Sequence, residues 1–359
     1  MRVVRSFFLF LTGLLAYSSA SAQNGAVMHS KQLSTPIVIA HRGASGERPE
    51  HTLGSYELAI EQGADFIEPD LVLTKDDLFV ARHENNIAET TDVADHPEFA
   101  DRKTSKVIDG ETQTGWFTED FTLAELKTLR AKERLPQLRP GNTDYDGRFE
   151  IPTLAEIIAL AKQASKDTGR TIGIYPETKH PSYFASIGHP MEARLVEQLR
   201  AAGWDSADAP VFIQSFEVDN LKKLHGLTKI RLIQLMYEAG GPADRAVPGY
   251  AAMMTPEGLR AVAAYAFGIG PNTGLVTDPK VDLVAHAHAA GLRVHPWTFR
   301  AENYFLTPEF RKGDNPAAHG DIEGAITEAL AIGVDGFFTD FPGKGVEARD
   351  RFLRARAGQ

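Results

Sequence analysis

Short apolar runs alternate with segments of helical periodicity through most of the chain. Runs such as 36–41 (PIVIAH) and 210–216 (PVFIQSF) have the length and the β-branched and aromatic content of buried strands. Segments such as 191–203 (MEARLVEQLRAAG) place apolar residues three and four positions apart and stop at a glycine, which is typical of amphipathic helices. The pattern therefore predicts repeated strand–helix units. The predicted strands are 36–41, 65–73, 171–177, 210–216, 230–236, 266–270, 292–297 and 335–340.

Eight strand–helix units in a chain of this length favour an α/β fold, the (β/α)8 TIM barrel. A doubly wound open sheet stays an alternative, because a count of units does not show that the sheet closes. One polar, turn-rich stretch at about 85–146 interrupts the repeat after the second predicted strand, and it holds a single short helical pattern. We predict a small insertion there and a shorter one at about 299–320.

The first 22 residues have the pattern of an export signal. Arg2 and Arg5 precede an apolar run at 7–16, and small residues form a cleavage site that ends at Ala22. The apolar run is shorter than the roughly 20 residues that span a bilayer. We therefore expect a signal peptide at 1–22 and a mature chain at 23–359 that is periplasmic or secreted and has no stable membrane anchor.

Composition narrows the classes of partner. The chain has no cysteine, so an exported form must be stabilised by its core or by bound ions, without disulfides. Its formal net charge is −10, and removal of Arg2 and Arg5, the only charged residues of 1–22, makes it −12. This balance argues against nucleic acid as a partner. A small anionic substrate remains compatible, since local cations can oppose the overall field.

Carboxylates gather at the ends of predicted strands. Glu68 and Asp70 flank Pro69, and side chains two apart on a strand point to the same face. They lie at the carboxyl end of the second strand, where barrel active sites are found. Carboxylates this close need a proton or a cation between them, and oxygen ligands suit Ca²⁺ or Mg²⁺. Glu177, at the end of the third strand, would complete a three-carboxylate metal site; a solvated strand end is the alternative.

Histidines and cations stand at the same strand ends. His41 and Arg42 end the first predicted strand, His83 follows the second, and Lys179 lies two residues after Glu177. Two histidines suit general acid–base catalysis, and an arginine and a lysine suit a phosphate. Each residue alone has an ordinary structural reading, but together they favour metal-assisted phosphodiester cleavage. No Gly-x-Ser-x-Gly elbow and no Gly-rich nucleotide loop occurs in the sequence.

Further residues near strand ends are candidates for the wall of a substrate pocket. Gln214 ends the fourth predicted strand, and Trp297 and Phe299 lie near the end of the seventh. Phe341 follows the eighth strand, and His295 shares the strand face of Trp297. Large aromatic side chains more often simply pack in the core. We nevertheless predict that Gln214, Trp297 and Phe299 contact the substrate, with the two aromatic residues lining the pocket for the alcohol.

The block HRGASGERPEHTLGSYELAIEQGADFIEPDLVLTKDD, at 41–77, resembles the signature of the glycerophosphodiester phosphodiesterases in their exported bacterial form. RHENNIAETTDV, IGIYPETKHP, GIGP, VHPWTFR and GVDGFFTDFP follow in the expected order, so the resemblance spans most of the mature chain. It implies a (β/α)8 barrel with an insertion after the second strand. The implied reaction is hydrolysis of glycerophosphodiesters to sn-glycerol 3-phosphate and an alcohol such as choline or ethanolamine.

The resemblance also implies roles for single residues. The cofactor it implies is a divalent metal, usually Ca²⁺ in the exported enzymes. It further implies that the glycerol hydroxyl next to the phosphate attacks first, giving a cyclic phosphate that water opens. The matching residues are His41 and His83 for the catalytic pair, Glu68, Asp70 and Glu177 for the metal ligands, and Arg42 and Lys179 for the phosphate contacts.

The chain departs from the family near the second histidine. Many members have His-Asp there, whereas this chain has His83-Glu84 and continues with Ala88-Glu89-Thr90. The change leaves open how His83 is oriented and which leaving group is accepted. His51, in PEHTL, is interpreted as a residue that orients its own turn or the neighbouring Glu50.

Two other functions remain alternatives. A lysophospholipase D or a phospholipase-type phosphodiesterase on the same barrel needs an apolar lip for acyl chains, and the 85–146 segment has no sustained apolar stripe. A non-catalytic phosphodiester-binding protein would not need two acid–base groups. The preferred alcohol and whether the chain forms a homodimer stay open.

Overall fold

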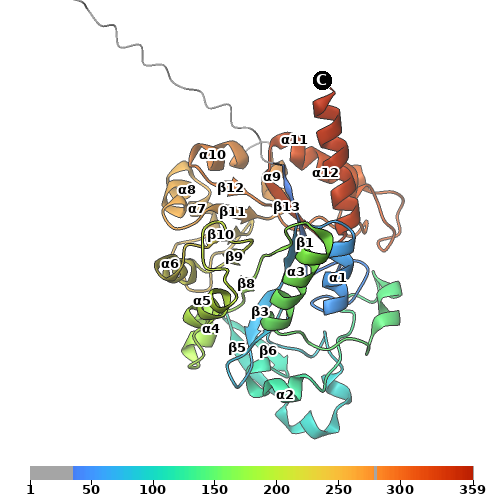
Figure 1. The fold of residues 1–359 in the computed structure, drawn as a ribbon, viewed down its shortest axis with the longest axis vertical. Coiled ribbons are helices and arrows are strands. Elements are labelled where there is room, and N and C mark those ends of the chain that lie inside the picture. Colours follow the sequence, from blue (N-terminus) through green and yellow to red (C-terminus); the bar gives the residue numbers. More distant parts are fainter. Residues whose placement is uncertain (1–34, 279–280, 359) are drawn as a thin grey trace, which may run out of the picture. The chain divides into compact units, whose positions relative to one another are not determined.

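The computed structural model describes residues 35–278 and 281–358, so the predicted signal peptide at 1–22 lies outside the described residues. Strands and helices alternate along the described chain (Figure 1). The barrel strands are β1 (Ile37–His41), β2 (Phe66–Glu68) continued by β3 (Asp70–Leu73), β7 (Gly173–Ile174) continued by β8 (Glu177–Thr178), β9 (Phe212–Ser215), β10 (Arg231–Met236), β11 (Gly268–Pro271), β12 (Arg293–Val294) and β13 (Gly336–Thr339).

The strands form a closed parallel sheet, so the (β/α)8 barrel predicted from the sequence is confirmed. Parallel pairing runs from β13 through β1 and β2 to β7, and from β8 through β9, β10 and β11 to β12. The Ile174 amide donates to the Pro210 carbonyl and joins the two runs. The Phe338 amide donates to the Pro296 carbonyl at 2.9 Å and closes the ring. An open sheet would have left these edges unpaired.

The second predicted strand, 65–73, is divided at Pro69 because proline has no amide hydrogen to donate to its neighbour. Pairing still continues across the division, since the Glu177 amide donates to the Pro69 carbonyl at 2.9 Å. Asp70 and Glu177 are direct partners in the register of β3 and β8. The register of β3 and β8, continued across the division, therefore sets Glu68, Asp70 and Glu177 next to one another.

The helices follow the strands, and several begin or end at typical capping residues. Thr153 and Glu156 form a capping box at the start of α3. Gly333 ends α11 with a φ of 106°, a conformation that favours glycine. The helices are α1 (Leu53–Glu61), α2 (Leu123–Leu126), α3 (Leu154–Thr168), α4 (Pro181–Ser186), α5 (Glu192–Ala201), α6 (Val218–Leu227), α7 (Tyr250–Met253), α8 (Pro256–Ala263), α9 (Thr273–Thr277), α10 (Leu283–Ala289), α11 (Ile322–Ile332) and α12 (Pro342–Ala357).

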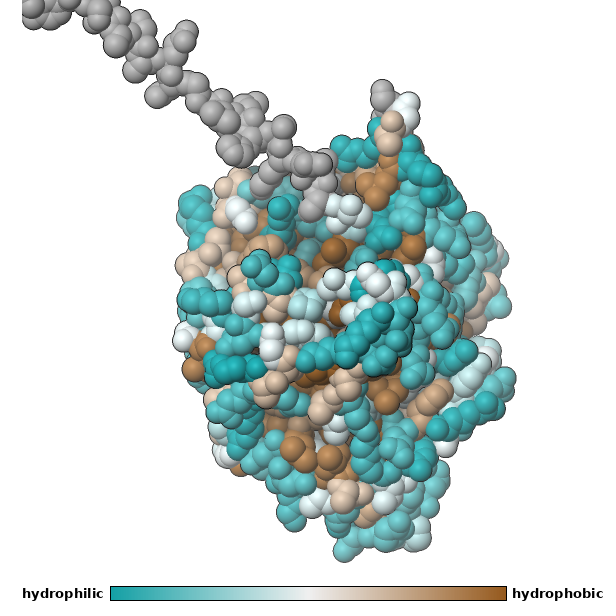
Figure 2. Space-filling view, in the orientation of Figure 1, coloured by the Kyte–Doolittle hydropathy of each residue, from teal (hydrophilic) through white to brown (hydrophobic). Residues whose placement is uncertain are grey.

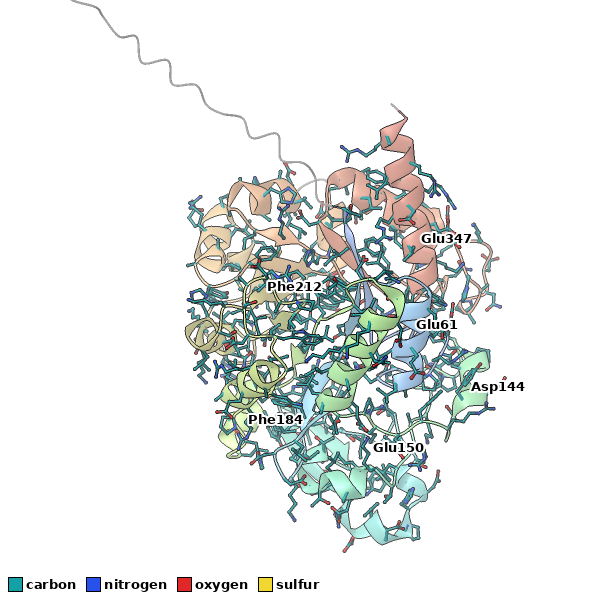
Figure 3. All side chains as sticks on the ribbon, viewed as in Figure 1. Glu61, Asp144, Glu150, Phe184, Phe212 and Glu347 are labelled. Carbon is teal, nitrogen blue, oxygen red and sulfur yellow. The ribbon has the colours of Figure 1, made fainter. Side chains whose placement is uncertain are left out.

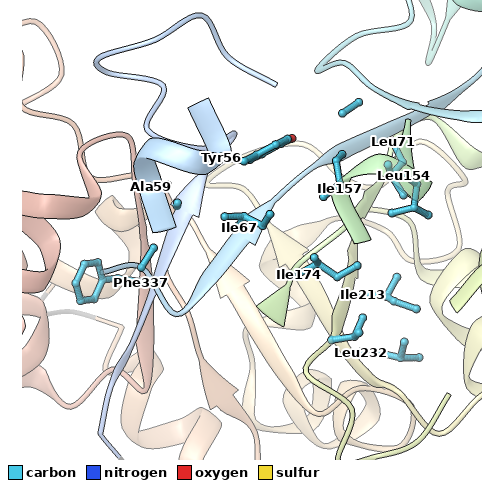
Figure 4. Packing of buried hydrophobic residues seen from close by; sticks show 14 of the residues in the cluster. Tyr56, Ala59, Ile67, Leu71, Leu154, Ile157, Ile174, Ile213, Leu232 and Phe337 are labelled. Atoms are coloured by element: carbon cyan, nitrogen blue, oxygen red, sulfur yellow. The ribbon is translucent and has the colours of Figure 1, made fainter. Parts of the chain in front are cut away.

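Alternate side chains of each strand build two separate layers of core. Outward-facing residues pack against the helices, as Figure 4 shows for Ile67, Ile174 and Ile213 beside residues of α1 and α3. Inward-facing residues fill the barrel. Phe212, which is labelled in Figure 3, is one of them. The two-residue period of a strand produces this division. The inner layer consists of Ile39, Tyr175, Phe212, Ile233 and Phe338.

The segment between β3 and α3 carries additional elements. β4 (Phe79–Ala81) runs antiparallel to β3, and β5 (Thr104–Ile108) pairs with β6 (Glu111–Gly115) as a hairpin. The short helix α2 and several 3-10 turns complete the segment. Arg139 connects it to the barrel, because its guanidinium donates to the Ser45 carbonyl at 2.9 Å and to the Glu302 carboxylate at 2.6 Å. The predicted insertion at about 85–146 falls within this segment.

Figure 2 shows a face covered mainly by hydrophilic residues, with apolar residues in small separate groups. Among the residues that the structure describes, no helix combines the length and the apolar content that a membrane crossing requires. Apolar residues of the helices belong to the core cluster around the barrel strands.

His295 makes the stability of the barrel depend on pH. It is 2% exposed, its ring lies 2.9 Å from the Tyr175 hydroxyl, and burial lowers its pKa from 6.5 to about 4. Between these values the unfolded chain binds a proton that the folded chain does not, so stability falls as pH falls. We expect a loss of about 3 kcal/mol from this group between pH 7 and pH 4.

Urea unfolding of the wild type and of His295→Gln across this pH range measures the effect. The variant should lose less stability on acidification than the wild type, by about 3 kcal/mol. The exposed His225 provides the matched control, His225→Gln, which should keep the wild-type slope. Equal slopes in all three proteins would contradict the assignment.

Candidate active site

A cavity of about 230 Å³ opens at the carboxyl ends of the barrel strands. We call its polar and charged lining residues the polar wall; they lie at the ends of the first four barrel strands and just after β4. We call its apolar lining residues, which lie in or just after β9 to β13, the aromatic wall. Such a cavity can hold a charged group on one side and carbon atoms on the other. The lining residues are His41, Arg42, Glu68, His83, Glu177, Lys179, Gln214, Phe216, Leu235, Tyr237, Trp297 and Phe338.

Most residues proposed from the sequence converge here, and Phe299 does not. Phe299 is buried with its ring edge-to-face on Phe337, whose side chain lies on the helix-facing side of β13. It lines a different cavity, together with Thr298 and Arg300. Trp297 remains at the aromatic wall, where its ring stacks on Tyr237 at 5.6 Å. The substrate contact expected of Phe299 has no basis in this geometry, because the ring packs outside the barrel.

Glu68, Asp70 and Glu177 form a buried carboxylate cluster. One oxygen of each lies within 4.8 Å of the others. Burial, followed by the charges of Asp70 and Glu177, raises the pKa of Glu68 well above its usual range. Burial likewise raises the pKa of Glu177 to about 8. Three carboxylates held this close fit a hard divalent cation, which would relieve both the desolvation and the repulsion.

Gln214 adds a further oxygen beside this cluster. Its side-chain amide donates to Glu68 at 3.2 Å, while its Oε1 atom is buried and has no hydrogen-bond partner among the described residues. A buried carbonyl oxygen without a partner is costly unless a ligand satisfies it. The donor set at this point is therefore oxygen-rich, as Ca²⁺ and Mg²⁺ require.

Asp70 is held differently from its two neighbours. Its Oδ2 atom lies 2.9 Å from His51 Nε2, and His51 Nδ1 lies 2.8 Å from the Tyr56 hydroxyl. Burial alone would raise the pKa of Asp70, but the hydrogen bond from His51 and the charge of Arg42 keep it well below its usual range. His51 thus contacts a proposed metal ligand, in addition to belonging to the turn inferred from the sequence.

Arg42 and Lys179 provide the positive charge of the polar wall. Arg42 donates to Glu50 at 3.1 Å, and its Nε lies 3.3 Å from Asp70. Lys179 Nζ lies 3.3 Å from Glu177. Burial alone would lower the pKa of both cations, but the surrounding carboxylates raise it above the ordinary values. Both side chains therefore stay charged at the edge of the cavity, where an anion would meet them.

A tight turn fixes the position of Arg42. Arg42 has a φ of 61° and Gly43 a φ of 87°, a left-handed conformation that is rare for residues other than glycine. A Cβ atom at Gly43 would lie 2.4 Å from Ser55 Oγ. The turn directs the Arg42 amide to Glu68, to which it donates at 2.8 Å. The backbone itself thus orients one carboxylate of the cluster.

His41 is anchored by a carboxylate that sequence reasoning did not identify. Its Nδ1 atom lies 2.6 Å from Asp340 Oδ1, and the other oxygen of Asp340 accepts from Arg139 at 2.5 Å and from Arg300 at 3.0 Å. Burial lowers the pKa of His41 to about 4; Arg42 adds to this effect and Asp340 opposes it. Asp340 therefore leaves the second ring nitrogen of a neutral His41 available to a ligand in the cavity.

His83 has a comparable anchor. Its Nδ1 atom lies 3.1 Å from Glu84 Oε1, and Glu84 Oε2 lies 2.8 Å from His180 Nε2. Burial lowers the pKa of His83 well below its usual range, and Arg42 and Lys179 add to this. The departure from the family pattern at position 84 therefore still supplies a carboxylate to this histidine.

The sequence analysis did not identify Asp340, Arg139 or Arg300. Of these three residues, only Asp340 could have been found from its position in the sequence. Asp340 follows the eighth strand directly, and a carboxylate at a barrel strand's carboxyl end is a candidate by position. Arg139 and Arg300 reach Asp340 from two long connections, 201 and 40 residues away in sequence. No local pattern predicts such contacts.

The site can therefore bind and cleave an anionic ester. Buried carboxylates suited to a cation lie beside two cations suited to a phosphate, and two anchored imidazoles face the same cavity. This combination provides charge neutralisation and proton transfer in one place.

Comparisons with known proteins identify a family for this chain. Residues 41–344 match the sequence model of the glycerophosphoryl diester phosphodiesterase family. A glycerophosphodiester phosphodiesterase of Arabidopsis thaliana is 39% identical over 348 residues, which cover 91% of this chain and 89% of the relative. A glycerophosphodiester phosphodiesterase of Haemophilus influenzae is 30% identical, with 94% and 96% of the two chains covered.

Solved structures share the fold. A phosphodiesterase of Oleispira antarctica, in complex with the product sn-glycerol-3-phosphate, has a TM-score of 0.60 and 23% identity, and covers 88% of this chain and 97% of that chain. A glycerophosphodiester phosphodiesterase of Agrobacterium tumefaciens has a TM-score of 0.56 and 19% identity, covering 87% and 99%. The match of the family model over most of the sequence shows that this chain belongs to the glycerophosphoryl diester phosphodiesterase family.

Proposed function

We propose that this chain hydrolyses glycerophosphodiesters to sn-glycerol 3-phosphate and an alcohol, using a divalent cation and histidine acid–base catalysis. The observation that carries the proposal is the convergence of a buried carboxylate cluster, two cations and two anchored histidines on one cavity. Support also comes from the relatives, which are named for this activity, and from the related structure that holds sn-glycerol-3-phosphate.

In this proposal Arg42 and Lys179 bind the phosphate oxygens and hold the diester against the cluster. His41 and His83 divide the proton transfers: one ring accepts the proton of the attacking hydroxyl, and the other donates to the leaving oxygen. A cation at Glu68, Asp70 and Glu177, most suitably Ca²⁺ and otherwise Mg²⁺, would neutralise charge on the phosphoryl oxygens. Asp340 and Glu84 each lie against one ring nitrogen of these histidines, and the other ring nitrogen is left for the proton transfer.

We propose further that the nucleophile is the glycerol hydroxyl beside the phosphate, which the family resemblance implies, and that water opens the cyclic phosphate. The aromatic wall would then pack on the glycerol carbons, with Trp297 and Tyr237 stacked as its outer part. We also propose that the chain is exported after cleavage near Ala22, as its first residues indicate.

Metal dependence is the first test. Chain 23–359 should release glycerol 3-phosphate from glycerophosphocholine with added Ca²⁺, and a chelator should stop the release. Glu177→Gln should weaken Ca²⁺ binding by at least about tenfold in calorimetry, because it removes a charged ligand. Glu197→Gln, at an exposed position of α5, is the control. Release that persists in the chelator would contradict the proposed role of the metal.

Removal of either histidine distinguishes an enzyme from a binding protein. His41→Ala and His83→Ala should each lower kcat by about 100-fold or more, since each removes a proton-transfer group. Ca²⁺ binding should persist in both, and the exposed His225 supplies the control variant His225→Ala. If both variants kept wild-type turnover, the acid–base assignment would be wrong.

Asp340 provides a test of His41 positioning. Asp340→Asn should lower kcat by at least about tenfold, because the amide can hold the wrong imidazole tautomer. Asp340 raises the pKa of His41, so removal of its charge should shift the acid limb of the kcat profile to lower pH. A pH titration of kcat checks the direction. A shift to higher pH would exclude the proposed role of Asp340.

A further inference from the structure

His180 lies between two carboxylates that come from different parts of the chain. Its Nε2 atom lies 2.8 Å from Glu84 Oε2, and its Nδ1 atom lies 2.6 Å from Asp109 Oδ2. Glu84 directly follows His83, whereas Asp109 belongs to the turn of the β5–β6 hairpin in the inserted segment. His180 itself precedes α4, and Figure 1 shows the hairpin beside this helix. The two partners of His180 are thus 96 and 71 residues away from it in the sequence.

His180 donates to both carboxylates because its ring carries a proton on each nitrogen. Burial lowers the pKa of His180, but the hydrogen bonds to Asp109 and Glu84 raise it to about 9. Burial would raise the pKa of Glu84, but the hydrogen bond from His180 and the charge of Lys179 hold it below its usual value. Both contacts therefore join a cation to an anion, and such hydrogen bonds are stronger than neutral ones.

The backbone at His180 has a conformation that its place in the sequence disfavours. Its φ is 50° and its ψ is 42°, in the left-handed region, which is uncommon for residues other than glycine. Pro181 follows, and a proline favours an extended conformation in the residue before it. A strained backbone of this kind persists only where the surroundings hold it. The two ring contacts of His180 are the interactions that hold it here.

Glu84 connects His180 to the catalytic cavity. Its Oε1 atom lies 3.1 Å from His83 Nδ1, and its side chain is 33% exposed. Among the residues that the structure describes, His180 is the one hydrogen-bond partner of Glu84 Oε2. Two arginines hold Asp340 in the corresponding place beside the other histidine. Without His180, a partly exposed glutamate would be free to turn into solvent, and His83 would lose its anchor.

We propose that His180 is a positioning residue for the catalytic His83, acting through Glu84, and that the hairpin turn holds His180 in place at Asp109. This inference rests on the proposed function, because it requires His83 to transfer a proton. No bond forms or breaks at His180. Its role is to fix Glu84, which keeps the proton of a neutral His83 on Nδ1 and leaves Nε2 for the reacting groups. The inserted β5–β6 hairpin thereby contributes to acid–base catalysis.

Nitrogen NMR of His83 separates positioning from a merely structural contact. Chain 23–359 with labelled histidines, assigned through His83→Gln, reports which ring nitrogen carries the proton, and the wild type should carry it on Nδ1. His180→Asn removes the bridge, and asparagine tolerates a left-handed backbone. This variant should move the His83 shifts toward the average of the two tautomers. Glu111→Gln, which removes an exposed carboxylate of the same hairpin, should leave them unchanged.

Turnover of glycerophosphocholine with Ca²⁺ gives a second measurement. His180→Asn should lower kcat by about tenfold and change KM by less than about twofold, because the phosphate contacts remain. Glu84→Gln should cost at least as much, and the double variant should lose no more than Glu84→Gln alone, since both residues act on His83 along one path. Asp109→Asn should lower kcat by about threefold, because an amide oxygen still accepts from His180. Glu111→Gln should keep the wild-type kcat.

Three results would contradict these proposals in different ways. If the losses of His180→Asn and Glu84→Gln multiplied in the double variant, or if the His83 shifts in His180→Asn matched the wild type, His180 would only fasten the hairpin to α4. Urea unfolding identifies a variant that fails to fold; Asp109→Asn then carries the test, because asparagine suits the φ of 51° at this turn. A wild type that releases no glycerol 3-phosphate from any glycerophosphodiester would instead reject the proposed function.

Discussion

Mutual repulsion among three buried carboxylates is the constraint on which the site depends. Glu68, Asp70 and Glu177 cannot all be charged and close without compensation. The barrel brings them together through the register of neighbouring strands. Compensation then comes from outside the cluster, since Arg42 and Lys179 approach from the strand ends and His51 donates to Asp70. The remaining charge imbalance is what makes the cluster suited to a divalent cation.

Carboxylates that are compensated by neighbouring cations also position the two histidines. Each imidazole has one nitrogen on a carboxylate, Asp340 for His41 and Glu84 for His83, and each carboxylate is itself held by further cations. Asp340 accepts from Arg139, which belongs to the segment inserted after β3. A buried carboxylate of this kind stays ionised only while its partners remain in place. The insertion therefore contributes to the position of His41.

Local sequence patterns were sufficient for the strand–helix repeat and for most of the polar wall. The two-residue alternation of strands and the glycine stops of helices predict the strand–helix repeat, and strand ends place His41, Glu68, Glu177 and Lys179 on one face. These inferences need only chain connectivity and parallel pairing. Phe299 shows their limit: it stands near a strand end like Trp297, yet its ring packs outward on Phe337.

Local patterns along the chain predict the repeat of strands and helices, the family resemblance and the polar residues that end the strands. Closure of the sheet, the contact of Asp340 with His41 and the approach of Arg139 to Asp340 from 201 residues away are visible only in the folded molecule. The same holds for the contact of His51 with Asp70. Such contacts join segments far apart in the chain, and their distances follow from packing.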